Sequence, residues 1–137
     1  MAYWLVKSEP SAWSWDMQVE AGVTNWDGVR NYQAANNLKA MALGDLAFFY
    51  HSVDQRQIVG IVRVCQTYHP DPSDPTGRFG MVKVETVKAL ETPVSLQQIK
   101  EHPHLQHLAL VRQSRLSVMP IDQDSWQILC HMGGVTP

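Results

Sequence analysis

Alternating and clustered hydrophobic positions divide the chain into short strands that are joined by brief turns. Residues 81–90 give the clearest case, because Val82 and Val84 point to one face of a strand while the charged residues beside them point to the other. Gly60 interrupts another strand pattern, which indicates a bulge or the close approach of another backbone or of a ligand. The strands predicted from these patterns are residues 3–7, 46–51, 58–68, 81–90 and 114–120.

Helices are predicted where apolar residues recur at helical spacing and a capping residue precedes them. Ser95 and Gln98 form a capping-box pattern, and Asp122 is suited to cap the last helix. A further helical or turn segment carries Leu105, Leu108 and Leu110. The predicted helices run from Ser11 or Ser14 to Glu20, from 31 to 41, from 95 to 102 and from 122 to 131.

Two stretches between these elements are predicted as loops. Residues 24–28 would present Trp26, and residues 70–80 are rich in proline and glycine, which is typical of an irregular surface loop. Strand and helix do not alternate regularly, so the elements favour an α+β fold with a mostly antiparallel sheet. A curved sheet or small barrel with helices over its openings would suit this pattern, and barrel mouths often bind small ligands.

Composition narrows the class of protein. The length of 137 residues suits a single domain over residues 1–137, and a hydrophobic content of 45% indicates a globular chain. No apolar run approaches the roughly 18 residues of a membrane span, and the start lacks a signal-peptide pattern, so we expect a cytoplasmic protein with no membrane partner. Cys65 and Cys130 lack metal spacing and fit a role as small buried side chains.

The charge balance is mildly acidic. A net charge of -2 and a pI near 6.3 count against a general nucleic-acid binder, which usually has an excess of basic residues. The same values allow a protein that reads one base in a pocket and contacts few phosphates.

The stretch 26–37, W-D-G-V-R-N-Y-Q-A-A-N-N, carries the strongest sign of a binding site. Trp26 offers a stacking face, and asparagine and glutamine carry the donors and acceptors that match the edge of a flat heterocycle. Tryptophan also serves as an ordinary core residue, and Trp13, Trp15 and Met17 are interpreted most simply as packing against the sheet. The residues alone indicate one wall of a pocket for a planar ligand with a polar edge, and a nucleobase fits this description best.

Five segments together resemble the EVE domain family, which belongs to the PUA-like superfamily and is related to YTH and ASCH domains. They are Y-W-L-V-K-S-E-P (3–10), W-D-G-V-R-N-Y-Q-A (26–34), N-N-L-K-A-M-A-L-G-D (36–45), F-Y-H-S (49–52) and R-L-S-V (115–118). The resemblance runs in order from residue 3 to about residue 132. It implies a PUA-like pseudo-barrel of mixed, mostly antiparallel β-strands flanked by helices. It also implies a non-catalytic pocket that recognises a modified nucleobase in DNA or RNA, with no cofactor and no metal.

The resemblance assigns site residues position by position. Trp26 matches the tryptophan of the W-x-G-V-R-N signature and is expected to form an aromatic wall. A YTH-type pocket has a second tryptophan near the second hairpin, but no tryptophan lies between Trp26 and Trp126, so Phe49 or Tyr50 would have to replace it. The expected base-binding residues are Lys7, Ser8, Trp26, Asn31, Phe49, Tyr50, His51, Ser52, Leu116 and Ser117.

Basic residues near this site are candidates for phosphate binding, because guanidinium groups pair with phosphate oxygens. Each of these residues alone is interpreted most simply as part of an ordinary solvated or salt-bridged surface. Arg112 and Arg115 together, at the R-L-S element, are stronger candidates for phosphate binding. Two or three neutralised phosphates would give a shallow salt dependence, which is compatible with the acidic pI. The phosphate-binding candidates are Arg30, Arg112 and Arg115, with Lys7 and Lys39 as further cations.

Two other functions stay open. A small hydrolase or nuclease would use His51 as its base, with Ser8 or Ser52 as nucleophile and Asp27 or Asp45 as the orienting carboxylate. However, His51 and Ser52 are adjacent at the end of one predicted strand, so their side chains point to opposite faces and cannot easily pair. The chain also lacks the G-x-S-x-G motif of a nucleophile elbow. The second alternative is a pocket for another small planar ligand.

The remaining candidates for chemistry are weaker. His102, His104 and His107 lack the spacing and the extra ligands of a zinc pattern, so we interpret them as a surface cluster. The expected partner is a nucleic acid that carries a modified base. A separately encoded nuclease or modifying enzyme could act on what the domain binds.

Overall fold

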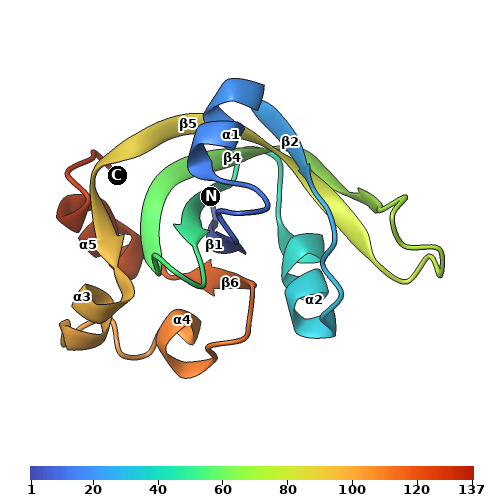
Figure 1. The fold of residues 1–137 in the computed structure, drawn as a ribbon. Coiled ribbons are helices and arrows are strands. Elements are labelled where there is room, and N and C mark those ends of the chain that lie inside the picture. The colour runs from blue at the N-terminus through green and yellow to red at the C-terminus, as the bar shows by residue number, and fades with distance from the viewer.

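One six-stranded sheet organises the computed structural model, which describes residues 1–137 (Figure 1). The strand order is β2-β5-β4-β3-β1-β6, and β1 and β3 are the one parallel pair among antiparallel neighbours. The mixed, mostly antiparallel α+β sheet is therefore confirmed. The strands are β1 (Tyr3–Ser8), β2 (Val23–Trp26), β3 (Leu46–His51), β4 (Gln57–Pro70), β5 (Gly80–Ser95) and β6 (Val118–Ile121).

Five helices lie along the edges and open sides of the curved sheet. Figure 1 shows the long strands β4 and β5 arching around β1 and β3. No helix is long and apolar enough to span a membrane. The helices are α1 (Trp15–Ala21), α2 (Tyr32–Ala40), α3 (Leu96–Glu101), α4 (Ala109–Arg112) and α5 (Gln123–Met132).

Side-chain caps fix where four of the helices begin. Ser14, and not Ser11, caps α1 by accepting a hydrogen bond from the backbone N–H of Met17. The capping box predicted at the start of α3 is present, and the predicted cap of α5 is also confirmed. Asn31 caps α2 by accepting from the N–H of Ala34. These caps satisfy backbone donors that the first helical turn leaves without partners.

Three predicted boundaries are wrong. The predicted loop at 24–28 contains β2, a four-residue edge strand that pairs with β5 and is too short to show an alternating pattern. β5 continues to Ser95, beyond the predicted end at residue 90. The last strand begins at Val118 instead of 114, because a turn closed by a hydrogen bond from Leu116 N–H to the carbonyl of Gln113 precedes it.

Stacked aromatic rings fill the core between the sheet and α5. Trp126 is fully buried and lies against Phe48, with ring centroids 4.0 Å apart, and against Tyr3 at 4.5 Å. Asp45, although charged, is also buried and accepts hydrogen bonds from Trp4 Nε1 and from the N–H of Ala42. The core is therefore mostly apolar, and the Asp45 carboxylate within it is paired, whereas Nε1 of Trp126 and the hydroxyl of Tyr68 are buried without a hydrogen-bond partner.

Gly60 is needed because the ring of Trp15 lies directly on the backbone of β4. The sheet register shifts between Ile58 and Gly60, so the predicted bulge is present. A Cβ atom added at Gly60 would lie 2.3 Å from Cη2 of Trp15. The predicted bulge is confirmed, but the close approach comes from a side chain, that of Trp15, and not from the backbone or ligand that the sequence predicted.

Gly60→Ala should lower the free energy of unfolding by about 1–3 kcal/mol, because the buried Trp15 ring would have to shift against Phe49. Urea-induced unfolding of the purified protein measures this change. Ala89 lies opposite Gly60 in β5 and is exposed, so Ala89→Ser is a matched control that should change stability by less than about 0.5 kcal/mol. An unchanged unfolding midpoint in Gly60→Ala would contradict the packing of Trp15 on β4.

Candidate functional site

Two tryptophans from different parts of the chain line one cavity. Its volume is about 590 Å³, which lies in the range of small-ligand sites. One wall comes from the end of β1 and the loop that follows it, and the other comes from β2 and the residue after it. The lining residues are Lys7, Ser8, Glu9, Ala12, Trp13, Thr24, Asn25, Trp26 and Asp27.

Trp26 is held from behind by the core. It is the last residue of β2, pairs with Val82 of β5, and is 8% exposed. Its ring meets that of Phe49 edge to face, with the centroids 5.5 Å apart and the planes at 85°. Phe49 is fully buried, so it supports the Trp26 ring and does not line the cavity as we predicted from the sequence.

Trp13 is the second aromatic residue of the cavity. It is half-buried in the loop between β1 and α1. Its Nε1 donates to Oε1 of the buried Gln18 at 2.9 Å, and the Ser8 hydroxyl donates to the Trp13 carbonyl oxygen. Trp13 does pack against the hydrophobic core, as the sequence indicates, but its place in the cavity lining was not predicted, because a second tryptophan was expected only after Trp26. The sequence signal that could have placed Trp13 in the site is its nearness to Lys7 and Ser8, which were predicted to bind the base.

Polar side chains at the cavity are free to bind a ligand. Glu9, Thr24, Asn25 and Asp27 all line it, and none of these side chains makes a hydrogen bond or ion pair within the protein. Carboxylates accept hydrogen bonds, and an amide both donates and accepts. The cavity therefore combines aromatic faces with unpaired acceptors and donors, which suits a flat molecule with a polar edge.

Lys7 stands at the border between this cavity and a neighbouring hollow. Its Nζ donates to the carbonyl oxygen of Ser114 at 2.9 Å and lies 5.7 Å from the centre of the Tyr50 ring. Burial lowers the pKa of Lys7 from its ordinary value of 10.5. The ammonium group is thus fixed in place at the mouth of the cavity.

Only Lys7, Ser8 and Trp26 of the ten predicted base-binding residues line this cavity. Asn31 and Leu116 line a separate hollow together with Arg112 and Arg115. The Asn31 side chain also serves as the α2 cap, which explains why it does not reach Trp26. The sequence could not show this separation, because it depends on how α2 and α4 lie in space.

The other predicted residues have supporting positions. Tyr50 and Ser52 line the hollow on the far side of Lys7. Ser117 accepts a backbone hydrogen bond from the N–H of Lys7, which holds the end of β1. These residues are close to the cavity and do not form its wall.

His51 is engaged at both ring nitrogens. The backbone N–H of Trp15 donates to Nε2 at 2.9 Å, so Nδ1 carries the proton and donates to Oε1 of Gln55 at 2.6 Å. The ring is therefore a buried connection between β3, α1 and the β3–β4 turn. It is not available as a base for Ser8, whose hydroxyl is bonded to Trp13.

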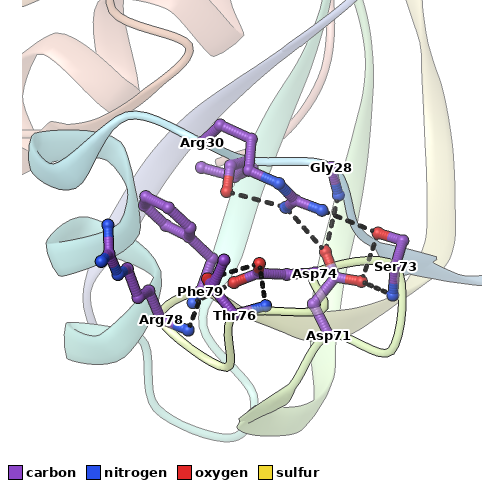
Figure 2. Close-up of polar contacts among 9 residues, drawn as sticks. Gly28, Arg30, Asp71, Ser73, Asp74, Thr76, Arg78 and Phe79 are labelled. Atoms are coloured by element: carbon purple, nitrogen blue, oxygen red, sulfur yellow. Dashed lines mark hydrogen bonds and ion pairs between the residues drawn. The ribbon is translucent and has the colours of Figure 1, made fainter.

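The predicted role of Arg30 in phosphate binding conflicts with its contacts. Its guanidinium pairs with Asp71 at 3.1 Å and donates to the Ser73 hydroxyl at 3.0 Å, as Figure 2 shows. Asp71 also accepts from the backbone N–H of Gly28 and from Ser73. Arg30 therefore ties the segment after Trp26 to the 71–79 loop.

Asp71 is the centre of this network, and its side chain is fully buried. Burial alone would raise the pKa of Asp71, but the hydrogen bonds from Ser73, Gly28 and Arg30 outweigh it and hold the pKa well below its ordinary value of 3.8. Asp74 acts similarly within the same loop, where the Thr76 hydroxyl is the main cause that lowers its pKa to about 2. The loop predicted to be irregular is thus an ordered support for the cavity wall.

No group of three histidine, cysteine, aspartate or glutamate side chains that could hold a metal ion lies together in the structure, the histidine cluster included. His107 instead pairs with the α5 cap Asp122, with Nε2 and Oδ1 2.7 Å apart.

Asp71→Asn should lower the free energy of unfolding at neutral pH by about 2 kcal/mol, because charge-assisted hydrogen bonds to a buried carboxylate are lost. The folded pKa is the depressed one, so this stabilisation is present above pH 3.8 and disappears as the pH falls towards the folded value. Unfolding measured from neutral to acidic pH should show the difference between the two proteins shrinking. Asp54→Asn at an exposed position is the control, and a difference that does not depend on pH would contradict the assignment.

Comparison with known proteins places the chain in a family. The EVE domain model matches residues 2–132. The crystal structure of Atu2648 from Agrobacterium tumefaciens is 45% identical, covers 98% of this chain and 94% of its own, and superposes with a TM-score of 0.95. The human THYN1 protein in complex with DNA containing 5-methylcytosine is 29% identical over 100% of both chains, with a TM-score of 0.88.

A more distant structure shares only the fold. The YTH domain of Zygosaccharomyces rouxii MRB1, in complex with N6-methyladenosine RNA, is 13% identical, covers 96% of this chain and 86% of its own, and has a TM-score of 0.60. The predicted PUA-like architecture is confirmed by these neighbours. The match over residues 2–132 shows that this chain belongs to the EVE domain family.

Proposed function

We propose that the protein is a non-catalytic binding module that takes a modified nucleobase of a nucleic acid into the cavity between Trp13 and Trp26. The observation that carries this proposal is the pairing of two fixed tryptophans with unpaired polar side chains around a cavity of about 590 Å³. Aromatic rings stack on either face of a base, and the polar groups contact its edge.

The energetics favour a base that has left its helical stack. Taking a base out of a duplex costs a few kcal/mol, and stacking on an aromatic side chain returns about 1–3 kcal/mol per base. Edge contacts add the remaining selectivity, because a wrong base would leave buried polar groups unpaired. Single-stranded nucleic acid would avoid the cost of unpairing and is expected to bind more tightly than duplex.

The polar lining favours a base with an exocyclic amino group. Glu9 and Asp27 contribute two carboxylates to the cavity, and Asn25 contributes an amide. A carboxylate accepts a hydrogen bond from the amino group of cytosine, whereas it would repel the carbonyl oxygen of thymine at the same position. Ala12 and the two indole rings supply the apolar surface that a methyl group requires.

The human THYN1 complex supports cytosine as the first base to test. That relative is 29% identical and was solved with DNA containing 5-methylcytosine. We therefore choose a 5-methylcytosine oligonucleotide as the first probe and the same sequence with unmodified cytosine as its control.

The contacts of His51 support binding without catalysis, because both ring nitrogens are engaged with other groups. Cleavage or modification of the bound nucleic acid would then require a separately encoded nuclease or modifying enzyme.

Trp13→Ala should weaken binding of the 5-methylcytosine oligonucleotide by about 1–3 kcal/mol, because one stacking face is removed. Fluorescence anisotropy with modified and unmodified strands measures the two dissociation constants and their ratio. Trp26→Phe tests the opposite wall with a smaller loss of core volume than alanine would cause.

Leu43→Ala is the control for this experiment, because Leu43 is 68% exposed and lies outside the cavity. Its affinity should match that of the unaltered protein. Equal affinity of the unaltered protein for modified and unmodified strands of every base tested would refute the proposal. If the protein instead binds a free planar molecule selectively, the cavity is better explained as a pocket for a small planar ligand other than a base in a nucleic acid.

A further inference from the structure

Three surface hollows beside the cavity are lined by basic and neutral residues and by no carboxylate. The first, of about 310 Å³, contains Arg112 and Arg115. The second and third, of about 330 and 450 Å³, share Arg56 and Lys100. Positive charge on this surface is therefore not offset by acidic residues within the hollows.

The hollows form one connected surface, because neighbouring hollows share residues. Ser114 lines the first and second, and Lys7 lines both the second hollow and the Trp13/Trp26 cavity. The hydrogen bond from Lys7 to Ser114 fixes this junction. Helix α4 contacts both α3 and β6, and Figure 1 shows α4 between α3 and α2. We call Arg56, Lys100, Lys7, Arg112 and Arg115 the basic track.

The basic track holds a large share of the protein's unpaired positive charge. Of the 11 lysine and arginine residues, only Arg30 and Arg63 form salt bridges with carboxylates, and both lie outside the track. Five of the other nine belong to the track. The net charge of -2 thus conceals a locally positive surface.

Two arginines of the track are oriented with their terminal nitrogens free. Nε of Arg56 donates to the carbonyl of Val53 at 3.0 Å, and Nε of Arg112 donates to the carbonyl of Gln106 at 2.8 Å. The terminal nitrogens of both guanidinium groups make no hydrogen bond within the protein. Paired terminal N–H groups match phosphate oxygens, and a side chain that is already oriented loses less entropy on binding.

We infer that the basic track binds the sugar-phosphate backbone of the strand whose base occupies the cavity. Arg112 and Arg115 form one arm, Arg56 and Lys100 form the other, and Lys7 lies where the track meets the cavity. The inference rests on the proposed function for the identity of the strand. It goes further in assigning the backbone path, including the arm at the β3–β4 turn and α3 that the sequence did not indicate.

The test compares pairs of substitutions that remove the same charge. Arg56→Gln with Lys100→Gln removes one arm, and Arg112→Gln with Arg115→Gln removes the other. Arg78→Gln with Lys88→Gln is the matched control, because both residues are exposed and line none of these hollows. Binding of an unmodified single-stranded oligonucleotide is measured over a range of salt concentrations.

Each arm variant should lower the slope of log affinity against log salt by about 1.4, since each lost phosphate contact on a single strand contributes about 0.7. The control pair should leave the slope unchanged. Trp13→Ala should also keep the slope, because it removes a base contact and no phosphate contact. If the slopes are equal in all variants, or if the unaltered protein does not bind the oligonucleotide at low salt, the inference that the basic track binds the backbone is wrong.

The outcomes for the track and for the base pocket can be separated. If Trp13→Ala removes the preference for the modified strand while the arm variants keep the full salt slope, the track fails and the pocket stands. If the arm variants lose slope but no protein prefers a modified strand, the base-reading function fails and the track stands. Polyglutamate that competes as well as the oligonucleotide at equal charge would overturn the assignment to nucleic acid.

Discussion

The buried carboxylate of Asp71 is the interaction on which the candidate site depends most. It joins a loop between β4 and β5 to the segment that follows Trp26, through Gly28, Arg30 and its own loop partner Ser73. Removing a charge from water is costly, and here the cost is offset because both carboxylate oxygens accept hydrogen bonds. Without this contact, the end of β2 would have only its pairing with β5 and the packing against Phe49 to hold it.

The two walls of the cavity differ in how they are fixed. The Trp26 wall is anchored by the sheet, the Phe49 ring and Asp71, all of which involve residues distant in sequence. The Trp13 wall is fixed locally by Ser8 and Gln18. Between these well-bonded walls, Glu9, Asn25 and Asp27 have no partners within the protein. The aromatic rings are thus held by packing and hydrogen bonds, as a binding site requires, while the unpaired polar groups beside them are available to a ligand.

The sequence predicted the local structure well and the site only in part. Helix caps such as Ser14, Ser95 and Asp122 depend on neighbouring residues and follow from pattern alone, whereas the contact of Trp15 with Gly60 joins residues far apart in the sequence. Trp26, which the sequence indicates through its polar surroundings and the family signature, lines the candidate cavity.

Contacts between distant residues account for what the sequence did not predict. Arg30 was a reasonable phosphate ligand until Asp71, 41 positions later, was found beside it. Trp13 looked like a core residue, because the pattern of its own segment does not reveal that β2 lies opposite. The four residues of β2 are too few to show an alternation of apolar and polar positions.

Indole N–H resonances in a ¹H–¹⁵N NMR titration test the central claim most directly. The protein has five tryptophans, so three of them, Trp4, Trp15 and Trp126, are internal controls in the core. Adding the modified single strand should shift the Trp13 and Trp26 indole signals far more than these three, and more than the unmodified strand does. Shifts confined to the core tryptophans, or no shift of Trp13 and Trp26 at concentrations where binding is measured, would contradict a base held between these two rings.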